Sequence, residues 1–123
     1  MKNLSDYISE SQTMLFDQTK SFFAFGNDQL NEKIEKKVTY VRLGGGLFTP
    51  KENVRTLVDG LSVILKIGIE KDVSENGIFN IIKRELNNYE CFYTGEISDC
   101  VDALAEYPIS REQIFNVFRY NKL

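Results

Sequence analysis

The chain contains no histidine, which limits the chemistry that its side chains can perform. Imidazole acid–base catalysis, histidine-dependent triads and histidine-ligated metal sites are therefore excluded. Two cysteines, Cys91 and Cys100, lack the CxxC spacing of a zinc or redox site. A nucleophile at Cys91 would also have no histidine to activate it. We expect both cysteines to be reduced, partly buried thiols.

Carboxylates are the next candidates for catalysis. Glu85 and Glu90 are five positions apart, which places them about 140° apart around a helix. They therefore do not form an acid/base pair on one face. An enzyme that uses Glu85 or Glu90 remains the least favoured of three hypotheses. The sequence predicts a non-enzymatic protein with no cofactor and no metal ion.

Three consecutive glycines, Gly44, Gly45 and Gly46, separate a strand-like run (38–43) from a helix start (49–52). Glycine is needed where φ is positive or where another group approaches the backbone closely. The run lacks both the Gly-Lys-Ser/Thr ending of a Walker loop and the spaced glycines of a dinucleotide fingerprint. It does precede a helix N-terminus, which attracts anions, and Arg42 is close in sequence. A plain tight turn and a ligand site both remain open.

The segment 85–94 combines polar and aromatic residues. Its asparagines interrupt a helix, which usually has a local cause. The segment either ends a helix and turns the chain, or it directs Asn88, Glu90 and Tyr93 into a pocket for a polar ligand. In the second interpretation the pocket includes Arg42 and the glycine turn, and the ligand resembles a nucleotide.

Residues 96–106 predict a helix with two distinct faces. At 100° per residue, the apolar side chains gather on one side and the acidic ones on the other. The apolar positions are Ile97, Val101 and Leu104, and the acidic positions are Asp99, Asp102 and Glu106. The acidic face is either an ordinary solvated surface or a surface that engages a basic partner by resembling a row of phosphates.

Length and composition indicate one globular domain, residues 1–123, with a real hydrophobic core. The formal net charge of −3 argues against direct binding to nucleic acid or to an anionic membrane. Neither a signal peptide nor an apolar run of about 20 residues is present. We therefore expect a soluble cytoplasmic protein.

The pattern along the chain predicts a helix-rich α+β fold with a small antiparallel sheet of about three short strands in the N-terminal half. Helices are expected over 5–20, 28–36, about 50–74, 78–89, 96–106 and from 111 onward, and strands over 21–25, 38–43 and 47–48. Ser5 and Asn27 are the expected caps of the first two helices, and capping boxes are expected at Thr49–Glu52 and Ser110–Gln113. Residues 61–70 fit both a helix and a strand, and the longer capped pattern favours the helix.

Three short motifs carry a family resemblance. They are Phe22-Phe23-Ala24-Phe25, Leu43-Gly44-Gly45-Gly46, and Glu85-Leu86-x-Asn88-x-Glu90 followed by Tyr93-Thr94. In this order they resemble a family of small proteins that phages and bacterial conjugative elements carry. The resemblance implies an accessory gene whose product acts by binding host machinery, and it transfers no catalytic residue.

The first functional hypothesis is therefore an interaction protein of a mobile element that inhibits a host defence protein, such as a CRISPR nuclease, by blocking a binding surface. The partner is then a host protein of the nucleic-acid-binding kind. Direct contact with nucleic acid or membrane is not expected, and a homo-oligomer is left open. The alternative is the small-ligand module described above.

Overall fold

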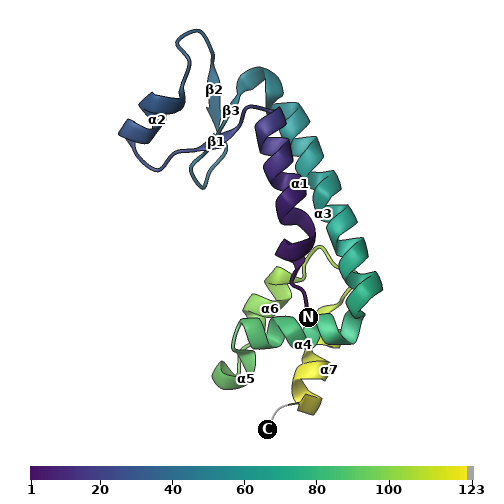
Figure 1. Ribbon diagram of the computed structural model, residues 1–123. Helices are drawn as coiled ribbons and strands as arrows, with labels where there is room; N and C mark the ends of the chain where they lie inside the picture. The colour runs from purple at the N-terminus through teal and green to yellow at the C-terminus, as the bar shows by residue number, and fades with distance from the viewer. Residues whose placement is uncertain (122–123) are drawn as a thin grey trace. The chain divides into compact units, whose positions relative to one another are not determined.

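The computed structural model describes residues 1–121 as a helix-rich chain with one small sheet (Figure 1). The elements follow one another in chain order as α1 (Leu4–Gln18), β1 (Phe22–Phe23), α2 (Asn27–Lys33), β2 (Tyr40–Arg42), β3 (Leu47–Pro50), the 3-10 helix η1 (Lys51–Asn53), α3 (Val54–Asn76), α4 (Ile78–Asn88), α5 (Cys91–Thr94), α6 (Ser98–Ala103) and α7 (Arg111–Asn121). The predicted fold class, helix-rich α+β with a small antiparallel sheet in the N-terminal half, is confirmed.

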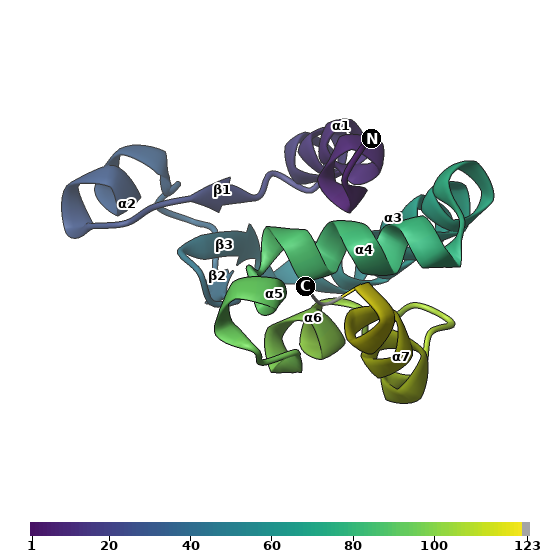
Figure 2. The ribbon, with the colours of Figure 1, turned by 90° about the horizontal axis from the view of Figure 1, so that it is seen from below.

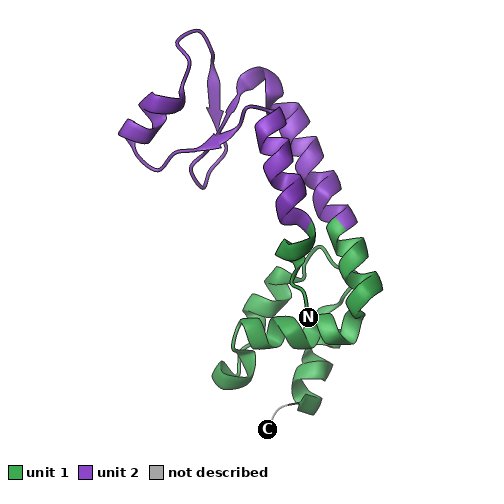
Figure 3. Ribbon diagram, in the orientation of Figure 1, with its two compact units in different colours: residues 1–7, 68–123 green, residues 8–67 purple. Residues whose placement is uncertain are grey.

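The chain divides into two compact units (Figure 3). Unit 1 combines the first seven residues with residues 68–123, and unit 2 comprises residues 8–67. Helix α3 passes from unit 2 into unit 1. The expectation of a single domain over 1–123 stays a prediction.

Unit 2 contains the sheet, whose strand order is β1-β3-β2 with both pairings antiparallel. Phe48 on the central strand β3 is paired with Phe22 on β1 and with Arg42 on β2. Strands β2 and β3 are joined through the glycine turn, so the prediction that residues 47–48 pair back onto the preceding strand is confirmed. All three strands are short, with two to four residues each.

Helices α1 and α3 contact each other closely in unit 2. A Cβ atom at Gly60 would lie 2.7 Å from a methyl carbon of Leu15, so the missing side chain permits the approach. Leu57, one turn earlier on α3, is fully buried. The uncertain stretch 61–70 lies inside α3, so the helical interpretation is confirmed.

Unit 1 is organised around α4, which contacts α5, α6 and α7 (Figure 2). The apolar residues of 78–89 predict a buried helix, and Ile81, Ile82 and Leu86 are almost completely buried. The prediction is wrong for Phe79 and Tyr89, which are exposed. Phe92 and Phe118 stack with their ring centroids 5.5 Å apart and so connect α5 to α7.

Of the four predicted helix starts, only the last is confirmed in detail. The Ser110 hydroxyl accepts the Gln113 N–H at 3.1 Å, and the Gln113 carboxamide accepts the Ser110 N–H at 2.7 Å. This reciprocal pair is a capping box. Ser5 is not a cap, because α1 already begins at Leu4. Asn27 is not a cap either, since α2 begins at Asn27 and Gly26 precedes it.

The capping box predicted at Thr49 is wrong. Strand β3 continues through Pro50, and η1 separates it from α3. The Thr49 hydroxyl is fully buried and pairs with the Ser21 hydroxyl at 2.9 Å. Threonine is common both as a helix cap and within strands, so the local sequence alone did not distinguish the two.

Candidate functional site

A buried ionic cluster lies at the centre of unit 1. Arg84 on α4 forms a bidentate ion pair with Asp72 on α3, with nitrogen–oxygen distances of 2.8 and 2.9 Å. The Arg84 Nε also donates to Glu85 at 2.8 Å. The Tyr107 hydroxyl donates to Asp72 at 2.5 Å. We call Asp72, Arg84, Glu85 and Tyr107 the ionic cluster.

The surroundings satisfy the ionic cluster completely. Asn76 donates to Asp72 at 2.7 Å and to the Tyr7 hydroxyl at 3.1 Å. Arg84 also donates to the carbonyl oxygen of Lys2 at 2.9 Å. Across residues 1–121, every buried side-chain nitrogen and oxygen has a hydrogen-bond partner. The cluster thereby connects the N-terminal residues, α3, α4 and the segment before α7.

Burial alone would raise the pKa of Asp72, but hydrogen bonds from Arg84, Tyr107 and Asn76 outweigh it and hold the pKa below its usual value. Burial would likewise lower the pKa of Arg84, and its bonds to Asp72 and Glu85 raise that pKa instead. For Tyr107, burial and the bond to Asp72 both raise the pKa. The cluster is therefore fixed as a carboxylate, a guanidinium and a neutral phenol.

The sequence-based reasoning missed this cluster. It named Glu85 only as a remote catalytic candidate, whereas the structure buries Glu85 against Arg84. One signal was present: Glu85 lies three and four positions after Ile82 and Ile81, on the predicted apolar face of α4. A charged residue on a buried helix face indicates a buried partner. For Glu85 that partner is the adjacent Arg84. The second partner of Arg84, Asp72, is 12 positions away and could not be identified from local spacing.

Asn88, Glu90 and Tyr93 all lie on the surface of unit 1. The Asn88 side chain donates to the Asn3 side chain at 3.0 Å. Glu90 has a left-handed backbone (φ 55°) where the chain turns from α4 into α5. Tyr93 is 92 % exposed. Arg42 and the glycine turn belong to unit 2, so the pocket proposed to join these two groups stays a prediction.

The predicted acidic helix is shorter than expected. Helix α6 covers only Ser98–Ala103, so Asp99 and Asp102 lie on it but Glu106 follows its end. All three carboxylates are exposed, and Ile97 and Leu104 are buried, as the two-faced pattern predicts. After α6 the chain turns, and Tyr107 is buried in the ionic cluster.

Glu96 has a structural role at the start of α6. Its carboxylate accepts the N–H groups of Ile97 and Ser98 at 2.9 and 3.0 Å and the Ser98 hydroxyl at 2.6 Å. The bonds from the Ser98 hydroxyl and from both N–H groups hold the pKa of Glu96 below its ordinary value. This arrangement fixes where the exposed acids of α6 begin.

In the glycine turn, all three glycines have positive φ, at 90°, 58° and 79°. Gly44 and Gly45 have open space where a side chain would be, whereas a Cβ at Gly46 would lie 2.6 Å from the Phe25 ring. Gly46 is therefore required by its backbone conformation, and a side chain there would have to displace the exposed Phe25 ring. The turn closes with the Leu47 N–H donating to the Gly44 carbonyl at 3.0 Å.

A hollow of about 280 Å³ lies beside this turn in unit 2. We call it the sheet hollow. Its lining comes from the sheet, the start of α2 and the glycine turn: Ala24, Phe25, Gly26, Asn27, Leu30, Arg42, Gly46 and Phe48. Two of the predicted site residues, Arg42 and Gly46, thus meet at one surface.

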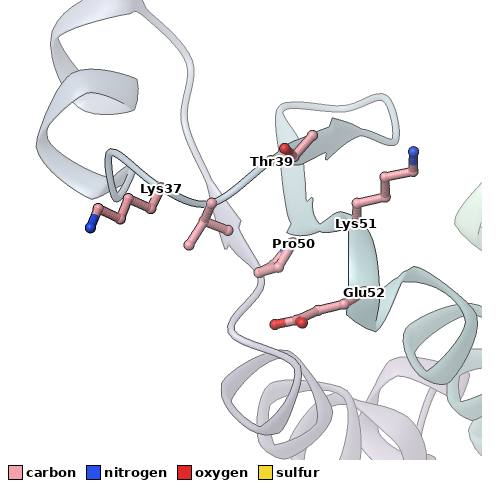
Figure 4. A pocket seen from close by; sticks show the side chains of 6 residues that line it. Lys37, Thr39, Pro50, Lys51 and Glu52 are labelled. Atoms are coloured by element: carbon pink, nitrogen blue, oxygen red, sulfur yellow. The ribbon is translucent and has the colours of Figure 1, made fainter.

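Two further hollows occur in unit 2. One, of about 530 Å³, lies where β2 begins and β3 ends, and Lys37, Thr39, Lys51 and Glu52 contribute to its lining. Figure 4 shows the ammonium groups of Lys37 and Lys51 pointing away from each other, so they do not converge on a single anion. The other, of about 450 Å³, is an apolar groove between α1 and α3.

Both cysteines are completely buried free thiols. Burial raises the pKa of Cys91, and it raises that of Cys100 to about 12. Within the described chain, no group of three His, Cys, Asp or Glu side chains is arranged to hold a metal ion. The thiols are thus protonated at neutral pH and enclosed by α4, α6 and their neighbours.

Fold and site together define a helix-rich α+β protein whose most reactive side chains are enclosed. The chain belongs to a protein family of unknown function, DUF7659, which matches residues 4–122. No curated protein and no solved structure matches it. None of the helices within residues 1–121 is long and apolar enough to cross a membrane.

Proposed function

We propose that this protein acts by binding another protein through an acidic segment, residues 89–106. Between Glu85 and Ser110 the sequence has six acidic residues and no lysine or arginine. Five of these acids are exposed: Glu90, Glu96, Asp99, Asp102 and Glu106. Tyr89 and Tyr93 add exposed aromatic surface to the same segment. This concentration of exposed carboxylates is the observation that carries the proposal.

The state of the reactive side chains supports a binding role over an enzymatic one. Asp72, Arg84 and Glu85 are buried and bonded to one another, which leaves them no free position for a substrate. The cysteines are enclosed, and their raised pKa values disfavour the thiolate form that a nucleophile requires.

The partner that fits this segment is a basic protein, and more specifically a nucleic-acid-binding effector. Carboxylates spaced along a surface present negative charge to a groove that normally holds phosphates. Tyrosines are favoured anchors in protein interfaces. Together with the motifs that resemble proteins of phages and conjugative elements, this favours an inhibitor of a host defence protein such as a CRISPR nuclease.

A charge-reversal experiment tests the proposal. The variant Asp99→Lys/Asp102→Lys/Glu106→Lys changes three exposed acids, and Glu10→Lys/Asp17→Lys/Glu70→Lys makes the same charge change at exposed positions outside the segment. The readout is cleavage of target DNA by purified, guide-loaded CRISPR nucleases. Wild type and the control variant should inhibit cleavage. The segment variant should need roughly tenfold more protein for the same inhibition, because each ion pair contributes up to about 1 kcal/mol.

Two outcomes would contradict the proposal. If wild-type protein inhibits none of the nucleases, the CRISPR form of the proposal is wrong. If the control variant loses as much inhibition as the segment variant, overall charge and not the acidic segment is responsible. Native mass spectrometry of the protein purified gently from a bacterial lysate then shows whether another protein partner is bound.

A further inference from the structure

One face of the sheet in unit 2 carries aromatic rings beside a free cation. Phe22 and Phe48 are paired in the register and stack with centroids 5.7 Å apart, and Arg42 is paired with Phe48 from the other side. Paired residues of neighbouring strands project to the same side. Tyr40, two residues before Arg42, meets Phe22 edge-on at 5.5 Å. The four side chains therefore share one face.

Helix α2 covers only part of this face. The Lys33 ammonium lies 5.9 Å from the centre of the Phe22 ring and donates to the Phe23 carbonyl at 2.9 Å. Gln29 accepts the Phe25 N–H at 2.8 Å. The sheet hollow remains between the first turn of α2, the strands and the glycine turn.

The lining of the sheet hollow combines three kinds of chemistry. Phe48 and Leu30 provide an apolar surface. Phe25 lines the hollow, is 76 % exposed and stacks on Phe23 with centroids 6.3 Å apart. Arg42 is exposed, and no carboxylate in residues 1–121 forms an ion pair with it. A planar ring can stack here while the guanidinium holds an anion in two-pronged fashion.

The charge of the molecule is divided unequally between its units. Unit 1 has seven Lys and Arg residues against eleven Asp and Glu, whereas unit 2 has eight against seven. Within residues 20–51, six cations face only three acids. The overall net charge of −3 therefore argues against nucleic-acid binding by unit 1 but not by the sheet region of unit 2.

We propose that the sheet hollow binds a nucleoside phosphate, with the base stacked on Phe25 and the phosphate held by Arg42. The hollow is close to the lower limit of about 300 Å³ for small-molecule sites, so it accommodates one base at a time. A free nucleotide and one nucleotide of a single strand present the same groups. Aromatic stacking combined with nearby cations is also how sequence-tolerant single-strand binders work. This site shares no residue with the acidic segment, and it goes beyond the protein-binding function.

The test measures fluorescence anisotropy of a labelled oligothymidine of about twelve nucleotides, with competition by AMP, by UMP and by a duplex of equal length. Arg42→Gln and Phe25→Ala should each weaken binding about tenfold, because each removes one of the two recognition elements. Arg55→Gln and Phe79→Ala are matched controls, since both side chains are exposed and lie outside the hollow. Arg42→Lys keeps the charge but loses the two-pronged geometry, and it should weaken binding partially.

The outcomes separate the two sources of the ligand. Binding of the oligonucleotide that AMP and UMP do not displace assigns the hollow to single strands, and full displacement assigns it to free nucleotides. The proposal is overturned if neither the oligonucleotide nor AMP or UMP binds at up to about 1 mM. It is also overturned if Arg55→Gln weakens binding as much as Arg42→Gln does. The charge-reversed acidic segment keeps every residue of the hollow, so it should still bind AMP and UMP, and failure here does not bear on the protein-binding function.

Discussion

Unit 1 buries ionised side chains, whereas unit 2 buries neutral hydroxyl groups. In unit 1, the ionic cluster contains the ion pairs of Arg84 with Asp72 and with Glu85. In unit 2, the hydroxyls of Thr19, Ser21 and Thr49 form a chain with oxygen–oxygen distances of 2.7 and 2.9 Å. The Thr19 hydroxyl also donates to the Leu15 carbonyl at 2.8 Å. Both arrangements satisfy their polar atoms, but they respond differently when one member is removed.

The difference follows from the cost of an unpaired group. A buried charge that loses its partner costs about 3–5 kcal/mol, and a neutral hydrogen bond contributes about 1 kcal/mol. Unit 1 is therefore specified by strict pairing between distant residues, and unit 2 tolerates loss of one bond. This contrast teaches that equal numbers of satisfied polar groups do not mean equal sensitivity to mutation or pH.

The largest effect is expected from Arg84→Met. The substitution keeps an apolar chain of similar length but leaves Asp72 and Glu85 buried without a cation. We expect the free energy of unfolding in urea to fall by about 3–5 kcal/mol. Arg119→Met, an exposed position on α7, should change it by less than about 0.5 kcal/mol. Similar values for both variants would show that the ionic cluster does not stabilise unit 1.

Acid should weaken unit 1 through Asp72. Its pKa is lower in the folded state than the unfolded value of about 3.9. The stabilisation is therefore present above the unfolded pKa and is lost as the pH falls through the folded pKa. Urea unfolding between neutral and acidic pH should show this loss in wild type. Asp72→Asn should be less stable at neutral pH and should show a weaker acid dependence, whereas the exposed Asp28→Asn should follow wild type. Parallel pH profiles for wild type and Asp72→Asn would contradict the assignment.

The smallest effect is expected from Thr49→Val in unit 2. The substitution preserves shape and strand preference but removes one end of the hydroxyl chain, while Ser21 keeps its bond to Thr19. The expected loss is about 1 kcal/mol in the free energy of unfolding. Thr39→Val, an exposed threonine just before β2, is the matched control. A loss as large as that of Arg84→Met would remove the distinction between the units.

Local patterns in the sequence predicted the elements but not the contacts between distant residues. The α3 helix, the apolar face of α4 and the capping box at Ser110 were predictable because each depends on residues three or four positions apart. The capping box at Thr49 failed because its hydroxyl pairs with Ser21, 28 positions away. Tyr107 reaches Asp72 across 35 positions, and no local spacing encodes that.

The candidate sites show the same limit. Arg42 and Gly46 were singled out from the glycine run, and they do line one hollow. The contributions of Phe25, Phe48 and Leu30 depend on strand register and on where α2 docks, so the sequence did not indicate them. Asp99 and Asp102 were correctly expected to be exposed, because the apolar positions of the same short helix identify its buried side.

The order in which the chain is synthesised has a consequence for unit 1. Lys2 accepts a hydrogen bond from Arg84, 82 positions later. At about 5–20 residues per second on a ribosome, Lys2 waits roughly 4–16 s for its partner. Every residue of unit 2 is made within that interval. The sheet of unit 2 can therefore form cotranslationally, whereas unit 1 closes only once α7 has emerged.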